Sequence, residues 1–177
     1  IHGAKLEALD EAGAARIFAA ARAKGIAAVA IVLMHAWKYT AHEARLGELA
    51  REAGFTQVSV SHQVSPLLRL VPRGDTTVVD AYLSPILRRY VEQVASELQG
   101  VRLYFMQSNG GLAEARHFQG KDAILSGPAG GIVGAARTAA MAGIHRIIGF
   151  DMGGTSTDVA LYDGAFERAL ETAVAGV

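Results

Sequence analysis

Hydrophobic and polar positions in the first third of the chain alternate between two patterns, one typical of helices and one of strands. Residues 10–24 have helical composition and a glycine follows them, which predicts a helix. The run 26–34 carries no charge and is rich in β-branched residues, so it predicts a strand buried on both faces. Thr40 and Glu43 have the spacing of a capping box and open a second predicted helix, which a short strand over 57–61 follows.

The central part of the chain carries a strong apolar stripe. Its members recur with the 3.6-residue period of a helix over 75–98, and Pro85 within it predicts a kink or break near residues 81–84. The stripe consists of Val79, Tyr82, Leu83, Ile86, Leu87, Tyr90, Val94 and Leu98. Further predicted elements are a strand over 101–106 and a helix that Gly127–Pro128 opens, with Pro128 as its first residue and Met141 as its last. Strands over 146–151 and 157–161 follow, and Asp163–Gly164 predicts a turn into a last strand.

Helices that alternate with strands predict an α/β fold, with a mostly parallel sheet, flanking helices and right-handed crossovers. The strands near the end of the chain lie close together in sequence and predict an antiparallel hairpin. The length of 177 residues allows one large domain or two small ones, and 51% hydrophobic residues are enough for a core.

Composition excludes several classes of protein. Seventeen basic residues balance seventeen acidic ones, which argues against a nucleic-acid or anionic-membrane surface. The chain has no cysteine, so disulfides, thiol nucleophiles and cysteine metal sites are excluded. The apolar runs are about half the length of a membrane span. With no signal peptide and no initiator methionine before Ile1, we expect a cytoplasmic protein or a piece of a longer one.

The segment 147–161 carries the most specific chemistry. An apolar strand ends at Asp151, the pair Gly153–Gly154 follows, and Thr155 to Thr157 supply three hydroxyl groups before a second apolar strand. Glycines that adopt positive φ leave backbone N–H groups uncovered, so this pattern predicts a phosphate-holding hairpin. Asp151 at the strand end is placed to hold a hydrated Mg²⁺. The alternative is a glycine-rich turn with a solvated aspartate.

Two more glycine-rich segments are candidates for binding. Residues 125–135 predict a helix with almost no side-chain bulk on one face, which suits a tight helix crossing at a hinge; a cofactor loop that includes Gly127, or simple close packing, are the alternatives. Residues 106–112 follow a predicted strand, at the end where α/β sheets bind ligands. Ser108 and Asn109 there are candidate donors to a phosphate or a substrate amide, or members of an ordinary polar turn.

The order of small-residue helix, strand and Asp-x-Gly-Gly-Thr hairpin resembles the ATPase fold of actin, sugar kinases and heat-shock chaperones. Three segments resemble, more narrowly, the hydantoinase A and 5-oxoprolinase family: Met106-Gln-Ser-Asn-Gly-Gly-Leu112, Leu125-Ser-Gly-Pro-Ala-Gly-Gly131 and Phe150-Asp-Met-Gly-Gly-Thr-Ser-Thr-Asp158. The resemblance covers essentially the whole chain.

The resemblance implies an ATP-dependent hydrolase of cyclic amides such as hydantoins or 5-oxoproline, with ATP and Mg²⁺ as cofactors. It implies that Asp151 organises Mg²⁺ through water, and that the amides of Gly153, Gly154 and Thr155 hold phosphate oxygens, with Thr157 or Asp158 fixing the loop. A hydantoinase B-type partner subunit or domain is also implied. An ATP-binding subunit of an acetone-type carboxylase and a non-catalytic nucleotide-binding module are the alternatives.

The resemblance also predicts how the chain divides. Members of this family are several hundred residues long and have another Asp-x-Gly-Gly-Thr hairpin near their N-terminus. We therefore expect the middle of such a protein. Residues 1–125 would form most of a first lobe without its phosphate hairpin, 126–143 a connecting helix, and 144–177 the start of a second ATPase lobe.

Overall fold

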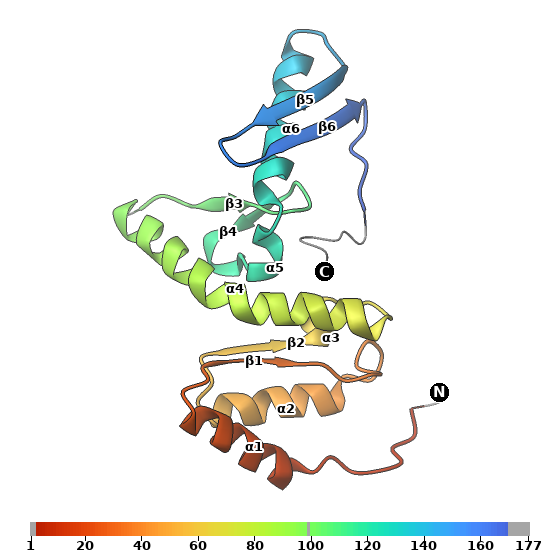
Figure 1. The fold of residues 1–177 in the computed structure, drawn as a ribbon, viewed down its shortest axis with the longest axis vertical. Coiled ribbons are helices and arrows are strands. Elements are labelled where there is room, and N and C mark those ends of the chain that lie inside the picture. The colour runs from red at the N-terminus through yellow and green to blue at the C-terminus, as the bar shows by residue number, and fades with distance from the viewer. Residues whose placement is uncertain (1–2, 99, 170–177) are drawn as a thin grey trace. The chain divides into compact units, whose positions relative to one another are not determined.

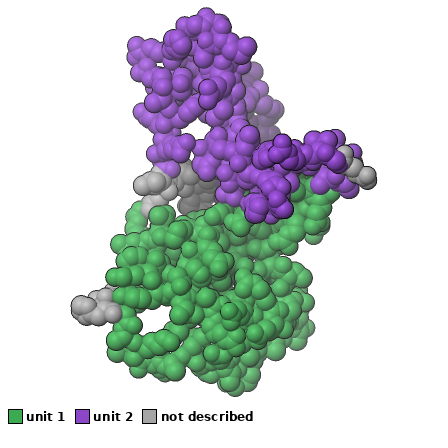
Figure 2. All heavy atoms as spheres, turned by 180° about the vertical axis from the view of Figure 1, so that it is seen from behind, with its two compact units in different colours: residues 1–92, 119–121 green, residues 93–118, 122–177 purple. Residues whose placement is uncertain are grey.

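A computed structural model describes residues 3–98 and 100–169. The chain forms two compact units, residues 1–92 with 119–121 and residues 93–118 with 122–177, which Figure 2 colours separately. The lobe boundaries expected at residues 125 and 143 concern a complete ATPase fold and stay a prediction. No helix among the described residues is long and apolar enough to cross a membrane.

The first unit begins with the alternation of helix and strand that the hydrophobic pattern predicts (Figure 1). Helices α1 (Glu11–Ala23) and α2 (Ala41–Glu52) alternate with the strands β1 (Ala28–Ile31) and β2 (Gln57–Val60). The two strands pair in parallel, from Ala28 beside Gln57 to Ile31 beside Val60. β1 is shorter than its apolar run, because the chain turns away after Ile31.

One face of this small sheet forms the hydrophobic core of the unit. Ile31, Ala50, Phe55 and Val60 are buried together, and side chains from α1 and α2 pack against them. Phe18 of α1 meets Phe55 edge to face, with ring centroids 5.7 Å apart. The apolar residues of this cluster on helix α2, Leu46 and Ala50, and Ala53 at its C-cap therefore recur at the spacing of an amphipathic helix.

The other side of β2 packs against a long helix through polar groups. Helix α4 (Leu70–Glu97) follows the short helix α3 (Ser61–Val64), and Ser59 of β2 donates a hydrogen bond of 2.7 Å to Asp80 of α4. The buried residues of α4 are Arg73, Thr77, Asp80, Ala81, Ser84 and Val91. Arg73, Thr77, Asp80 and Ser84 are three or four residues apart, and Val91 lies seven residues after Ser84, so these positions form one helical face.

The apolar stripe predicted for this helix is not the face that is buried. Tyr82 is 70% exposed, and Ile86 is 48% exposed. The helix that the stripe predicts is confirmed, but its fully buried face is the polar one, because those side chains find hydrogen-bond partners across the sheet. The period of the apolar residues alone does not show which face has such partners. The helix also runs through Pro85 without a break. Ser84 before the proline and Arg88 after it both make hydrogen bonds, to Gly120 and Gln57, that hold the helix on either side.

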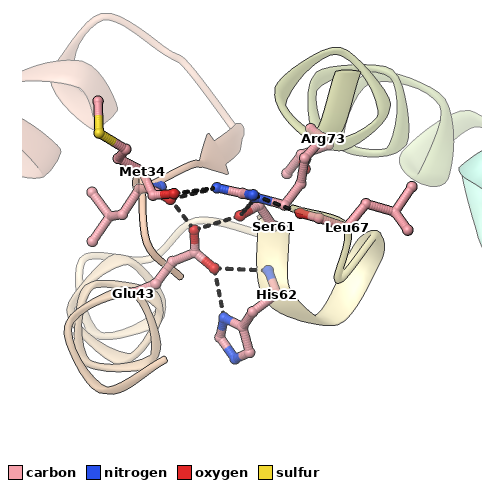
Figure 3. Close-up of polar contacts among 8 residues, drawn as sticks. Met34, Glu43, Ser61, His62, Leu67 and Arg73 are labelled. Atoms are coloured by element: carbon pink, nitrogen blue, oxygen red, sulfur yellow. Dashed lines mark hydrogen bonds and ion pairs between the residues drawn. The ribbon is translucent and has the colours of Figure 1, made fainter. Parts of the chain in front are cut away.

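Glu43 of α2 does not form the predicted capping box. The helix begins after Thr40 as expected, but Thr40 makes no side-chain cap and the Glu43 side chain is fully buried (0% exposed). Its carboxylate accepts hydrogen bonds from Leu33 N (3.0 Å) and Ser61 Oγ (2.7 Å). It also accepts one from His62 N (2.8 Å), and His62 Nδ1 lies 2.5 Å away (Figure 3).

Arg73 of α4 supplies the opposite charge, and it too is fully buried (0% exposed). Its Nε donates to Ser61 Oγ at 2.9 Å, so one hydroxyl bridges the guanidinium and the Glu43 carboxylate (Figure 3). The remaining donors of Arg73 bind the carbonyl oxygens of Leu33, Met34, Leu67 and Leu68. Both charges are therefore paired and fully hydrogen-bonded, the condition under which burial is tolerated.

The second unit contains two antiparallel hairpins and a helix. β3 (Tyr104–Met106) pairs with β4 (Leu112–Glu114), and β5 (Arg146–Met152) pairs with β6 (Thr157–Asp163). Among the described residues, β1–β2 is thus the one parallel pair, and the expected mostly parallel sheet is wrong for this part of the chain. The strand after residue 101 turns back instead, because Gly110 adopts φ +79° and Gln107 N binds Gly111 O.

Helix α6 (Ser126–Met141) forms where the small-residue segment predicts it, but its contacts differ from the prediction. It begins at Ser126, so Pro128 is its third residue and not its first. Gly131 and Gly134 are exposed, and no described atom lies within 4 Å of where a Cβ would stand. The tight crossing expected at these glycines is therefore absent from the described part of the chain. No strand follows Gly164 up to residue 169, and the rest of the expected last strand lies outside the described residues.

Replacing Arg73 by Met should destabilise the first unit by about 3–5 kcal/mol, because the Glu43 carboxylate would stay buried without its counter-charge. Adding Glu43→Leu should cost less than the sum of the single changes, because the second change removes the stranded charge. Urea unfolding followed by the fluorescence of Trp37, the one tryptophan in the sequence, measures both effects.

Arg45→Met is the matched control, because Arg45 pairs with Glu11 and Glu48 at the surface. Its effect on the urea midpoint should be much smaller than that of Arg73→Met. Equal effects at the two arginines, or strict additivity of Arg73→Met and Glu43→Leu, would contradict the account of the buried pair.

Candidate functional site

The predicted phosphate hairpin forms the turn between β5 and β6. The ladder pairs Asp151 with Asp158 and Met152 with Thr157. Beyond it, Gly153 N donates to Ser156 O at 2.9 Å and closes the turn. Directly opposed residues of an antiparallel pair project from the same face of the sheet, so Asp151 and Asp158 present their carboxylates side by side. Both residues are exposed.

The two glycines of the turn do not have the backbone conformation expected from the sequence. Neither Gly153 nor Gly154 is among the glycines with positive φ, because the hydrogen bond from Gly153 to Ser156 closes the turn without one. The two glycines instead leave the backbone of the turn without side chains. A Cβ on Gly154 would meet no described atom within 4 Å, and one on Gly153 would meet the Ser156 carbonyl oxygen at 3.5 Å. A ligand can therefore approach this backbone directly.

The chemistry of the turn fits a phosphate group together with a cation. Thr155 and Thr157 are exposed, and hydroxyl and backbone N–H groups are donors that suit phosphate oxygens. Two adjacent carboxylates would repel an anion held beside them, and a divalent cation between the charges removes that repulsion. Mg²⁺ keeps several waters and needs only one or two carboxylates, so Asp151 and Asp158 fit it.

The polar turn after β3 is built differently. Ser108 donates through both its N and its Oγ to the carbonyl oxygen of Asp122, each at 2.7 Å, and Ser108 Oγ accepts from Leu125 N at 3.2 Å. Asn109 Oδ1 accepts from Gly111 N at 2.7 Å. The hydroxyl proton of Ser108 is thus engaged within the protein, and the side-chain amide nitrogen of Asn109 is a donor that this turn can offer a ligand.

The predicted site residues fall into two groups. The hairpin brings together Asp151, Gly153, Gly154, Thr155 and Thr157, and the turn after β3 brings together Ser108 and Asn109. Gly127 is the second residue of α6, two positions after Leu125, and it is exposed with no described atom within 4 Å of a Cβ position. The pairing of Asp151 with Asp158 has a signal in the sequence, since both aspartates flank the glycine turn at positions that a hairpin places opposite each other.

Replacing Gly154 by Val should leave the thermal stability of the chain nearly unchanged, because the position is exposed, has room for a side chain and does not require positive φ. Differential scanning calorimetry of the variant beside the unmodified chain measures this. Gly110→Val is the contrasting variant, because Gly110 has φ +79° and a branched side chain is strained there. Equal losses of stability at the two glycines would contradict the described turn.

Comparisons with known proteins agree with these motifs. The model of the hydantoinase/oxoprolinase family matches residues 73–177, and that of the hydantoinase/oxoprolinase N-terminal region matches residues 1–54. 5-Oxoprolinase 1 of Arabidopsis thaliana is 49% identical over 160 residues, which are 86% of this chain and 12% of that protein.

Two solved structures share the fold. The crystal structure of an ATP-dependent caprolactamase from Pseudomonas jessenii aligns with a TM-score of 0.78 and 35% identity, over 91% of this chain and 24% of that one. The nucleotide-free structure of acetone carboxylase aligns with a TM-score of 0.76 and 25% identity, over 88% and 23%. The chain therefore has their α/β fold and spans less than a quarter of the length of each of these relatives.

Proposed function

The chain belongs to the hydantoinase/oxoprolinase family, and on that premise we propose that it is part of an ATP-dependent enzyme that opens cyclic amides. The observation that carries the proposal is the turn between β5 and β6, where an open glycine backbone adjoins the facing carboxylates of Asp151 and Asp158. The relatives named 5-oxoprolinase and ATP-dependent caprolactamase support the class of reaction.

The chemistry explains why such an enzyme needs ATP. A ring amide resists hydrolysis in neutral water because its nitrogen is a poor leaving group and its carbon is a weak electrophile. Phosphoryl transfer from ATP to the lactam oxygen turns that oxygen into part of a leaving group. One water then adds to the carbon and the ring nitrogen leaves, and a second water displaces phosphate from the same carbon. The protein's contribution is to position the reactants and to stabilise charge around the transferred group.

Each hairpin residue has a role in this scheme. Asp151 holds hydrated Mg²⁺, with Asp158 beside it as the second carboxylate. The backbone N–H groups of Gly154 and Thr155 donate to phosphate oxygens, because no described atom lies within 4 Å of a Cβ position on Gly154. The N–H of Gly153, expected to bind phosphate as well, is engaged by Ser156 O and keeps the turn closed. Thr157 fixes the loop by starting β6 opposite Met152.

The second group of residues would bind from the turn after β3. Asn109 would donate through its amide nitrogen to a phosphate or to the lactam carbonyl, and Ser108 would hold the turn in shape. Gly127 would leave room for the ligand at the start of α6.

The identities of the relatives favour a lactam substrate over a ketone. The 49% identity with a 5-oxoprolinase is well above the 25% identity with acetone carboxylase, although the folds of the chain and of acetone carboxylase agree. We therefore take 5-oxoproline as the first substrate to test, and a carboxylation reaction as the alternative.

The proposal also includes a hydantoinase B-type partner, the two-lobed actin-like ATPase fold for the full-length protein, and a cytoplasmic location.

Substitutions at Asp151 and Gly154 in the full-length protein should impair different steps, turnover at Asp151 and nucleotide binding at Gly154. Asp151→Asn keeps the shape but removes a charge that faces the cation, so 5-oxoproline-dependent ATP hydrolysis should fall about 10²-fold while nucleotide still binds. Gly154→Val blocks the approach of a phosphate oxygen and should abolish binding of a non-hydrolysable ATP analogue. Calorimetric titration and a phosphate-release assay measure the two effects.

Asp163→Asn is the matched control, because Asp163 lies on the same hairpin but pairs with Arg146 at the far end of β5 and β6. It should leave both binding and turnover unchanged. If Asp151→Asn and Gly154→Val both bind the ATP analogue and hydrolyse ATP as the unmodified protein does, the β5–β6 turn is not a phosphate site. It is then a simple glycine turn.

A further inference from the structure

Two carboxamide side chains meet beside Gly111 in the turn after β3. A Cβ on Gly111 would stand 2.9 Å from Asn109 Oδ1 and 3.5 Å from Gln107 Oε1. Gly111 is not among the glycines with positive φ, so its backbone conformation does not call for glycine. Any side chain there would instead displace the Asn109 carboxamide, which Gly111 N holds at 2.7 Å. The missing side chain thus makes room for the two carboxamides.

The backbone of Gln107 is held at both of its polar groups. Gln107 N donates to Gly111 O at 2.8 Å, and Gln107 O accepts from Gly110 N at 2.9 Å. The turn itself lies against α6, because a Cβ on Gly110 would stand 3.4 Å from Val133 Cγ2. The side chain of Gln107 therefore starts from a fixed point within the second unit.

The Gln107 carboxamide is uncommitted, unlike that of Asn109. Gln107 is half-buried, and its side chain makes no hydrogen bond to any described residue. Every buried side-chain polar atom among those residues has a partner, so the oxygen and nitrogen of Gln107 lie where a ligand can reach them. Asn109 has its oxygen engaged by Gly111 N and offers a ligand only its nitrogen.

An uncommitted carboxamide matches the ring amide of a lactam. A carboxamide presents an acceptor oxygen and a donor N–H on the same edge. A small ring holds its amide in the cis form, so the C=O and N–H of a lactam also lie on one edge. The two edges pair through two hydrogen bonds. A ketone offers only an acceptor, and a trans peptide bond points its two groups in opposite directions.

We propose that Gln107 recognises the lactam substrate by pairing its carboxamide with the ring amide. Gln107 Nε2 donates to the lactam oxygen, and the ring N–H donates to Gln107 Oε1. The lactam oxygen keeps a second lone pair for the phosphoryl group. The inference rests on the proposed function and adds to it the residue that separates a lactam from a ketone.

Two ligands that differ only at the ring nitrogen test this pairing. The γ-lactone of 2-hydroxyglutarate has an oxygen where 5-oxoproline has its N–H, so it cannot donate to Gln107 Oε1. Calorimetric titration of the full-length protein with a saturating non-hydrolysable ATP analogue gives both dissociation constants. The unmodified protein should bind 5-oxoproline about tenfold more tightly than the lactone.

Three variants separate the two hydrogen bonds. Gln107→Leu removes both, so 5-oxoproline should bind about 10²-fold more weakly and its preference over the lactone should fall to within about twofold. Gln107→Glu keeps an acceptor for the ring N–H but loses the donor, so both ligands should weaken while the preference remains. Asn109→Ala should weaken both ligands alike, because Asn109 only donates.

Gln93→Leu is the matched control, because Gln93 is exposed on α4 and belongs to neither group of site residues. It should change neither dissociation constant. Gln107→Leu should also keep the parental melting temperature in differential scanning calorimetry, since the Gln107 side chain bonds to no described residue.

Two results would overturn the inference and leave the proposed function intact, provided that 5-oxoproline still stimulates ATP hydrolysis. One is a parental preference for 5-oxoproline in Gln107→Leu. The other is equal binding of the two ligands by the unmodified protein. If the unmodified protein neither binds 5-oxoproline nor hydrolyses ATP in its presence, the proposed function fails together with the inference.

Discussion

The buried charge pair of Glu43 and Arg73, joined through the hydroxyl of Ser61, is the interaction on which the first unit depends. It ties the loop after β1, helix α2, the start of α3 and helix α4 to one another through fully buried side chains. Neither charge could be buried alone, because an unpaired ion costs several kcal/mol in such a place. The position of α4 over the sheet follows from this pair.

The same constraint explains why α4 buries polar residues. Once Arg73 is anchored, the residues one turn apart along the helix, Thr77, Asp80 and Ser84, must also face the sheet. Each finds a hydrogen-bond partner, and no buried side-chain polar atom among the described residues is left without one. Asp80 and Ser84 then become available to hold Gly120 and Lys121. The bridged charges of Glu43 and Arg73 therefore also set which face of α4 meets Gly120 and Lys121.

Sequence patterns predicted the local elements well and the tertiary contacts poorly, for a physical reason. Helices α1 and α2 and the β5–β6 hairpin have periodic apolar residues and glycine stops that act within a few residues, so they were predicted correctly. Glu43 looked like a cap because a capping box is a local pattern, whereas its real partners lie 10 and 18 residues away in sequence. The hairpin's motif was equally local, and only its pairing placed Asp158 beside Asp151.

The fate of the lactam oxygen tests the central claim most directly. Full-length protein would be given ATP and 5-oxoproline labelled with ¹⁸O in the ring carbonyl, and the inorganic phosphate would be analysed by mass spectrometry. If the reaction passes through phosphoryl transfer to that oxygen and displacement of phosphate from carbon, the label appears in the phosphate. Label found only in the carboxylate of the opened amino acid, with ATP consumed at the parental rate, would contradict the account.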